Sequence, residues 1–386
     1  MYKWNIQKLK SLLNYYRSEQ RKCSDPVLLN ELENTIQSIH FVIDVYDYNL
    51  RAKKTDYFFS TSSFEDVIDD DLRIVEKYGI YCPIIRRFGE YENRLNIKTI
   101  NVQKISTNYN HIISVSNEFY SSIPGIFSQT YHSISRDFKD TVSFVKLNGK
   151  IKEFGQTYPI YNTGISYFEI GISRCVHDYA SAIHEFAHGI TNKLNCDILL
   201  DENKYCFIEV DSLFFELLGL DFIGEKLDIP IETYKVNLDY LRHYLYCADL
   251  MCAKLDMYSD LNYKQLYNKG NLKKFLKSQL RFDNLRIKDT LINYMRDNMH
   301  YIVSYLTAIE LYLIYQEFPN IALDLLYKII IQKNMSTEEY LKFVNSLGIK
   351  PGYNFEKYLS ILFDRSKELK NEKSLRYKNW WVKKFI

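Results

Sequence analysis

The sequence has few of the residues that interrupt helices, and it has no long apolar run. Its 386 residues include only 13 Gly and 7 Pro, too few for the turns of a many-stranded sheet protein. No stretch approaches about 18 uncharged apolar residues, which excludes a conventional transmembrane helix. The N-terminus lacks both an apolar segment and a small-residue cleavage site. We therefore expect a mainly α protein in the cytoplasm.

A charge excess and a regular cysteine pattern are also missing. The 50 Lys and Arg nearly balance the 48 Asp and Glu, so a net charge of +2 gives no reason to expect nucleic acid as a partner. The 7 cysteines include no C-x-x-C pair and are expected to be reduced thiols. Tyrosine is abundant, with 34 residues, and most are expected to be packing residues with a hydrated hydroxyl.

Helical periodicity dominates the chain, with one interruption between about 141 and 172. There, residues 141–145 and 165–170 alternate with period two, which predicts a small sheet. Glycine and proline punctuate the stretch between them, at Gly149, Gly155, Pro159 and Gly164. Helices are expected near residues 4–21, 26–54, 64–79, 108–122, 175–194, 205–222 and 298–317, and onward to about 370.

Residues 184–188 read His-Glu-Phe-Ala-His, the most informative pattern in the chain. With 8 His in 386 residues, an H-E-x-x-H pattern is expected by chance only about 0.01 times. Residues four apart lie on one helix face, so His184 and His188 can offer two imidazoles to one zinc ion while Glu185 sits beside them. The pattern predicts a zinc hydrolase site on a buried helix.

A hydrolytic zinc ion usually takes three protein ligands and leaves a fourth position for water. Glu209 is the best candidate for the third ligand, because Ser212 and Glu216 follow it on the same helix face and give a polar stripe on an apolar segment. Glu185 cannot ligate the ion together with both histidines of its own turn. Its predicted role is general base toward the zinc-bound water.

Several neighbours of the motif have roles that the sequence leaves open. A carboxylate normally receives the outer N–H of a zinc-bound histidine, and Asp178, Asp211 and Glu216 are candidates for that contact. His177 lies on nearly the same face as His184, although an additional lone histidine is more often a packed or capping residue. The nearby cysteines are expected to be small buried hydrophobes: Cys175, Cys196 and Cys206.

These residues carry a resemblance to a known family. The motif at 184–188, followed by residues 207–216 (FIEVDSLFFE), resembles the paired motifs of the thimet oligopeptidase and oligoendopeptidase F family of zinc peptidases, H-E-F/L-G-H and V-E-x-P-S-x-x-x-E. Residues 300–308 are similar to that family's tyrosine-rich helix, which reads F-Y-V-Y-K-Y-A-T-G in the oligoendopeptidase F branch, and residues 334–349 resemble the C-terminal helices of that branch. The resemblance covers about residues 155–370.

The resemblance implies a mainly α, zincin-like metallopeptidase fold with a small sheet beside the motif helix. It implies zinc as the cofactor, bound by His184, His188 and Glu209, with Glu185 as the base. Tyr305 is implied as the donor that stabilises the oxyanion, and Tyr301 lies four residues away on the same helix face, where it can hold the substrate. Packing by both tyrosines is the alternative.

The chain departs from the family pattern at several points. Ala187 stands where the family has Gly, Asp211 stands where it usually has Pro, and the family's histidine before the tyrosine helix has no counterpart in register, since only His300 is near. The part before the motif is roughly half the family's usual length, so a shortened N-terminal region is expected.

The function expected from these patterns is that of a zinc-dependent endopeptidase or oligopeptidase acting on peptide substrates. One alternative is a dedicated protease that processes a leader or partner peptide. Another is a catalytically degenerate, zinc-stabilised protein that binds peptides without cutting them, which the altered second motif and the missing histidine favour.

No repeat, low-complexity segment or linker divides the chain. We expect an N-terminal helical region over 1–140, the zinc peptidase region over 141–370 and a basic aromatic tail over 371–386. The tail contains Trp380 and Trp381. Docking on the protein's own surface and a peripheral contact with a membrane or partner both stay open for it.

Overall fold

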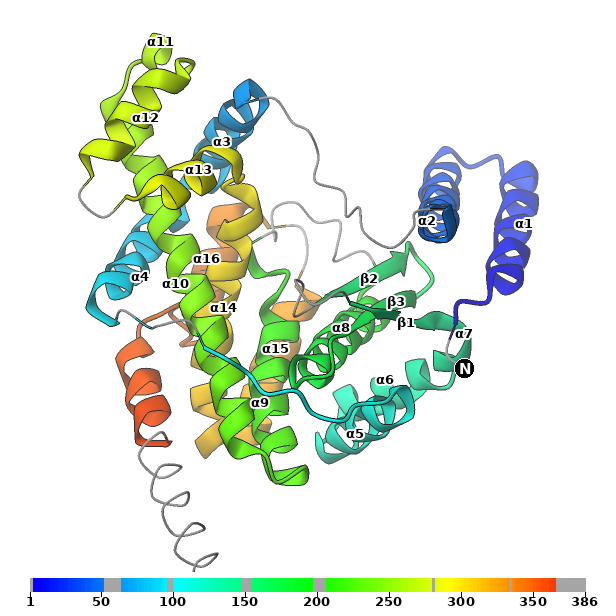
Figure 1. The fold of residues 1–386 in the computed structure, drawn as a ribbon. Helices are drawn as coiled ribbons and strands as arrows, with labels where there is room; N and C mark the ends of the chain where they lie inside the picture. The colour runs from blue at the N-terminus through cyan, green and yellow to red at the C-terminus, as the bar shows by residue number, and fades with distance from the viewer. Residues whose placement is uncertain are drawn as a thin grey trace, which may run out of the picture.

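The fold is mainly helical, with one small sheet (Figure 1). The computed structural model describes residues 3–51, 64–95, 97, 100–147, 154–196, 206–279, 282–332 and 335–365, and the predicted tail at 371–386 lies outside these residues. Within the described part of the chain, no helix combines the length and apolarity needed to cross a bilayer.

The helices before the sheet include those predicted near 4–21, 26–54, 64–79 and 108–122, although residues 52–54 lie outside the described part. In chain order they are α1 (Ile6–Lys22), α2 (Pro26–Arg51), α3 (Phe64–Tyr78), the 3-10 turn η1 (Gly79–Tyr81), α4 (Cys82–Leu95), α5 (Tyr109–Ser122), α6 (Ile126–Ser135) and α7 (Phe138–Thr141).

The helices after the sheet include the predicted motif helix and a helix that follows Glu209. In chain order they are α8 (His177–Leu194), α9 (Val210–Lys226), α10 (Pro230–Asp260), α11 (Tyr263–Leu266), α12 (Lys269–Ser278), α13 (Asn284–Ile292), α14 (Arg296–Glu317), α15 (Pro319–Ile331), α16 (Thr337–Ser346) and a last helix over 355–365. The 31-residue α10 was not predicted, nor were α11 to α13.

The sheet contains β1 (Val142–Lys146), β2 (Gly155–Ile160) and β3 (Ile165–Ile172), in the order β1-β3-β2. β1 runs parallel to β3, and β2 pairs antiparallel with it. Gly155 and Pro159 were predicted to lie between strands, but both belong to β2. A proline is tolerated there because β2 has a strand on only one side in the described sheet.

The two faces of β3 pack against different layers of the protein, because successive strand residues point in opposite directions. Tyr167 packs into a core with α1 and α2, which includes Trp4. Phe168 points the other way, toward α8, where its ring lies 5.3 Å from the ring of Phe186. A Cβ on Gly189 of α8 would lie 2.5 Å from the Phe168 ring, so this glycine allows the sheet to approach the helix closely.

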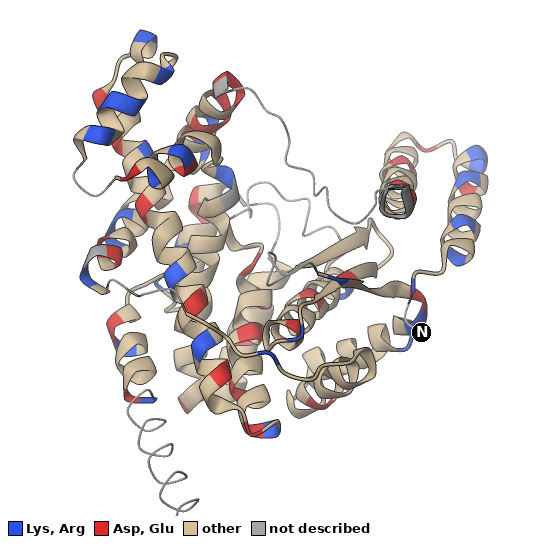
Figure 2. Cartoon of the chain, in the orientation of Figure 1, with Lys and Arg blue, Asp and Glu red and all other residues tan. Residues whose placement is uncertain are grey.

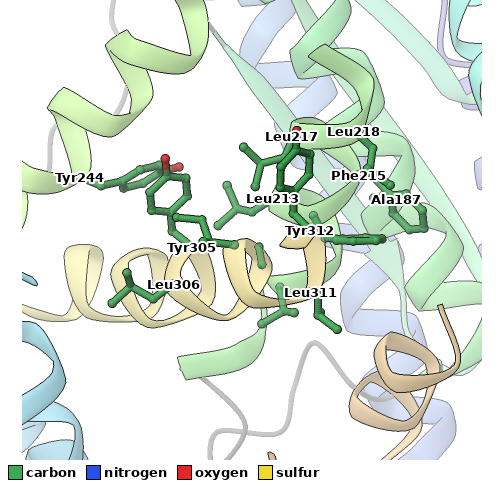
Figure 3. Packing of buried hydrophobic residues seen from close by; sticks show 14 of the residues in the cluster. Ala187, Leu213, Phe215, Leu217, Leu218, Tyr244, Tyr305, Leu306, Leu311 and Tyr312 are labelled. Carbon is green, nitrogen blue, oxygen red and sulfur yellow. The ribbon is translucent and has the colours of Figure 1, made fainter. Parts of the chain in front are cut away.

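Helix α9 is the centre of the larger core because it is apolar on nearly all sides. It packs against α8, α10 and α14. That core includes residues from α5 and α6 as well as from the helices after 141, so it joins both sides of the region boundary expected at 140. Figure 3 shows part of its interior, where Tyr305 of α14 lies beside Tyr244 of α10. Phe215 of α9 packs against rings of α5 and α6, those of Phe119, Tyr120 and Phe127.

Charged residues of both signs are spread over the surface helices (Figure 2). The α11–α12 segment carries lysines without acidic residues, whereas the adjacent α3 is rich in Asp and Glu. The two are joined by Tyr267, which donates a hydrogen bond to Asp69.

A buried ion pair anchors the beginning of α14. Asp71 of α3 is fully buried and pairs with Lys254 of α10. The other hydrogen bonds to Asp71 come from the Tyr258 hydroxyl, at 2.6 Å, and from the main-chain N–H of Met295 just before α14, at 2.6 Å. Lys254 also donates to the carbonyl of Asn293. One carboxylate thereby ties three helices together.

We expect Lys254→Met to lower the free energy of unfolding by about 3–5 kcal/mol, because it leaves Asp71 charged and uncompensated in the interior. Chemical denaturation of the variant and the wild type measures the difference in the free energy of unfolding. The double variant Asp71→Asn/Lys254→Met should recover part of the loss. Lys342→Met, which removes an exposed pair with Glu338 on α16, is the matched control and should leave stability unchanged. Equal stability of the Lys254 and Lys342 variants would contradict the anchoring role.

Candidate functional site

Helix α8 presents both motif histidines on one face. The ring centroids of His184 and His188 lie 5.0 Å apart. Asp178 fixes the turn before the helix by accepting hydrogen bonds from the main-chain N–H groups of Ser173 and Arg174, both at 2.9 Å. Arg174 there adopts a positive φ of 65°. Asp178, one of the three carboxylates left open by the sequence, is thus committed to this turn and does not face the histidines.

Glu209 occupies the position directly before α9, and two serines set its placement. Its main-chain N–H donates to the Ser304 hydroxyl of α14 at 3.3 Å, and that hydroxyl donates to the Cys206 carbonyl at 3.0 Å. Ser212, one turn along α9, donates to the Glu209 carboxylate at 2.9 Å. Helices α9 and α14 together therefore aim this carboxylate at α8.

The three predicted ligands converge on one point. Glu209 Oε2 lies 3.2 Å from His184 Nε2 and 3.0 Å from His188 Nε2, and one donor atom from each residue lies within 4.8 Å of the others. In a tetrahedral zinc site with bonds of about 2.0–2.1 Å, ligand atoms are spaced about 3.3 Å apart. The donor types and spacings fit a zinc ion, and ligation itself stays a prediction.

The two remaining carboxylates left open by the sequence face the outer nitrogens of the histidines. Glu216 Oε2 lies 3.1 Å from His184 Nδ1. Asp211 Oδ1 lies 4.0 Å from His188 Nδ1, while Thr191 donates a hydrogen bond to the other Asp211 oxygen. His188 Nδ1 is buried and has no hydrogen-bond partner among the described residues, and the Asp211 carboxylate lies just beyond hydrogen-bond distance from it.

His184, His188 and Glu209, called the metal group below, carry charges that stabilise each other. Burial opposes ionisation of Glu209, but His188 and His184 hold the pKa of its carboxyl well below the usual range. Burial likewise opposes protonation of His188, but the Glu209 carboxylate raises the pKa of this imidazole to about 9. A carboxylate between two imidazoles is thus ionised at neutral pH, as a metal ligand must be.

Glu185 lies on the side of α8 that meets the sheet. Its side chain is buried, and burial raises the pKa of its carboxyl. Thr157 of β2 donates a hydrogen bond to Glu185 Oε2 at 2.6 Å. No sequence pattern singled out Thr157, because it lies 28 residues from Glu185 on a strand that was not predicted.

The two tyrosines of α14 differ in their surroundings. Tyr305 is 1% exposed and packs between Phe88 and Tyr244, whose ring centroid lies 4.3 Å away (Figure 3). Its buried hydroxyl faces the hydroxyl of Tyr358, which itself donates to Asn237. Tyr301 is half-buried, and its ring lies 4.2 Å from that of His300 at a tilt of 40°. The catalytic role of both stays a prediction.

The other histidine and cysteine candidates lie outside the group. His177 is buried at the start of α8, with its ring edge-on to Tyr240 and its Nδ1 3.3 Å from Cys175 Sγ. Burial raises the pKa of the Cys206 thiol well above its usual range, as expected for a buried, unreactive cysteine. Cys196 is partly exposed, so the prediction that it is buried was wrong.

A cavity of about 460 Å³ lies elsewhere in the fold, beside the second half of α9. Its lining includes Phe119, Tyr234 and Tyr315, and an ion pair between Asp221 and Arg365 forms part of its wall. None of the three predicted metal ligands lines it.

Comparison with known proteins identifies the fold. A protein from Chlamydophila abortus described as a peptidase superposes with a TM-score of 0.53 at 12% identity, over 93% of this chain and 63% of that one. A structure described as oligoendopeptidase F gives a TM-score of 0.51 at 12% identity, over 93% and 66%. No protein-family model and no curated protein matches the sequence.

These likenesses confirm the mainly α fold of the oligoendopeptidase F type that the motifs led us to expect. At such low identity they establish the fold alone. The chain spans slightly less than two thirds of the length of the solved chains that it matches.

Replacing Glu209 by Ala should lower zinc occupancy, because two imidazoles remain of a three-ligand set. Elemental analysis after dialysis against limiting zinc measures the occupancy. Glu225→Ala, an exposed acid on the same helix, is the control and should keep the wild-type zinc content. Full occupancy in the Glu209 variant would show that the third ligand is another residue.

Without metal, the protein should lose stability as the pH rises from about 6.5 to about 9. The folded state raises the pKa of His188 from 6.5 to about 9, so the stabilisation is complete below the unfolded-state pKa and disappears as the imidazole deprotonates in the folded protein. Unfolding midpoints of the chelator-treated protein across this range measure the effect. The decline should be much smaller in Glu209→Gln, and an equal decline there would rule out this pair as its source.

Proposed function

We propose that this chain is a zinc-dependent peptidase that hydrolyses peptide bonds. The observation that carries the proposal is the convergence of His184, His188 and Glu209 beside the buried carboxyl of Glu185. The likeness in fold to structures described as peptidases supports the choice of peptide as the substrate class.

Each protein group has a chemical task in this proposal. His184, His188 and Glu209 hold the zinc ion, with Glu216 and Asp211 orienting the two imidazoles. The ion, when bound, supplies a Lewis acid and makes water more acidic. Glu185 accepts the proton of the attacking water and returns it to the leaving amine. A carboxyl whose pKa is raised by burial suits both transfers, because it can hold the proton between them.

For the oxyanion we propose a tyrosine of α14, with Tyr305 as the donor and Tyr301 on the same face as a substrate contact. The Tyr305 hydroxyl is buried, and a donor held away from water stabilises a charge that develops only during reaction more strongly than a hydrated one. Packing between Phe88 and Tyr244 is the competing role for this residue.

Two other functions share the same fold and ligands. A protease dedicated to one leader or partner peptide would differ in substrate range, and a zinc-stabilised binding protein would lack turnover. The altered second motif lends little weight to the binding protein, because Asp211 faces His188 and Thr191 holds it there. The substitution therefore adds a carboxylate beside the ligands. Turnover of a quenched-peptide library separates the binding protein from both enzymes.

Glu185→Gln should keep its zinc and lose peptide turnover by about 100-fold or more, because an amide of nearly the same shape cannot accept a proton. Zinc content and turnover are measured on the same preparation. Glu169→Gln, at a buried carboxyl of β3 outside the group, serves as the control and should stay active. Wild-type turnover by the Glu185 variant would exclude this residue as the base.

Tyr305→Phe should reduce turnover by roughly 100-fold while zinc content and melting temperature stay near wild type, because one oxyanion donor is lost. Tyr301→Phe is measured beside it and should raise KM more than it lowers kcat. If only Tyr301→Phe loses turnover, the two roles are exchanged. Full activity of both variants would leave packing as the role of the pair.

A further inference from the structure

The edge strand β2 contacts Glu185 through two residues on one face of the strand. Gly155 and Thr157 are two positions apart, so both point toward the same side of the sheet. The register places them opposite Ile170 and Phe168 of β3. Phe168 packs against Phe186, the residue after Glu185 in α8, so the packing of sheet on helix fixes where the two β2 residues meet the carboxylate.

Thr157 binds Glu185 at two points. Its hydroxyl donates to Oε2 at 2.6 Å and lies 3.0 Å from the main-chain carbonyl oxygen of the same residue. Hydrogen bonds to a charged acceptor are short and about twice as strong as neutral ones. With Oε2 engaged by the strand, Oε1 is the oxygen left to accept a proton.

Gly155 provides the space for that second oxygen. A Cβ at this position would lie 2.4 Å from Glu185 Oε1 and 2.9 Å from its carboxyl carbon, too close for any real contact. Every other residue type would therefore displace the carboxylate from its place against the strand. The glycine is required here for close approach, and not for an unusual backbone conformation.

We propose that Gly155 and Thr157 form a cradle that positions Glu185 for proton transfer. Both are positioning residues, since they act through Glu185, and the inference rests on the proposed peptidase function. Holding the carboxylate by one oxygen prevents its rotation away from the metal group and keeps the other oxygen available. The rate of proton transfer depends steeply on the position of the Glu185 carboxylate. Substrate binding does not use this carboxylate in the proposal, so the effect is expected in kcat and not in KM.

The kinetic test uses Thr157→Val, which keeps the shape of the side chain and removes the hydroxyl. In the zinc-loaded enzyme we expect kcat to fall about 10-fold or more, with KM and zinc content unchanged. Thr157→Ser keeps the hydroxyl and should restore most of kcat. Gln156→Val, on the exposed opposite face of β2, is the matched control and should keep wild-type kinetics.

A second measurement needs no activity. In the metal-free protein, Thr157→Val should raise the equilibrium constant for unfolding by about 10-fold or more in the wild-type background. When Glu185 is already Ala, the same substitution should raise this constant much less. Gly155→Ala is an independent variant that should lower kcat at full zinc content even if Thr157→Val does not fold, because its Cβ displaces the carboxylate.

The outcomes separate the two proposals. A wild-type protein without turnover overturns the peptidase function, and the stability cycle then still decides whether Thr157 and Glu185 are coupled. A wild-type enzyme with turnover, combined with wild-type kcat in Thr157→Val and Gly155→Ala, overturns the cradle. Additive stability effects of Thr157→Val and Glu185→Ala overturn it as well.

Discussion

The rest of the structure depends on one constraint, the burial of an ionisable helix face. Helix α8 lies between the sheet and α9, and its interior face carries two histidines and a glutamate. Buried charges are costly unless they are paired, so each neighbour must bring a partner of matching chemistry. The sheet brings Thr157 to Glu185, and α9 brings Glu209 and Glu216 to the histidines. The arrangement of layers and the chemistry of the group thus have the same physical origin.

Helix α14 links this group to the far side of the molecule. At its start, Asp71 and Lys254 fix the chain to α3 and α10. Two turns later, Ser304 holds the main chain of Glu209. Displacement of α14 along its axis would break both sets of hydrogen bonds. A buried network distant from the metal group therefore contributes to the placement of its carboxylate ligand, and α14 also positions the two tyrosines proposed for the oxyanion.

Much of the fold could be predicted from local pattern. Helical periodicity indicated α1, α2, α5, α8 and α14 to within a few residues, because amphipathic spacing is a property of neighbouring positions. Strand β2 was missed because Gly155 and Pro159 normally mark turns, and their acceptance in a strand depends on an edge position and on the nearness of Glu185. Helix α10 was not predicted, although Pro230 in its first turn is a typical helix start.

For the candidate site, the sequence by itself determined the chemistry that is available. The spacing of His184 and His188 guarantees a shared helix face, and a polar stripe at Glu209 on an apolar segment requires a buried polar partner. Only the tertiary structure decided which carboxylate serves which imidazole, that Asp178 holds a turn instead, and that Thr157 reaches Glu185. Local spacing is set by helix geometry, whereas contacts between distant segments depend on strand register and helix packing, which no short stretch of sequence encodes.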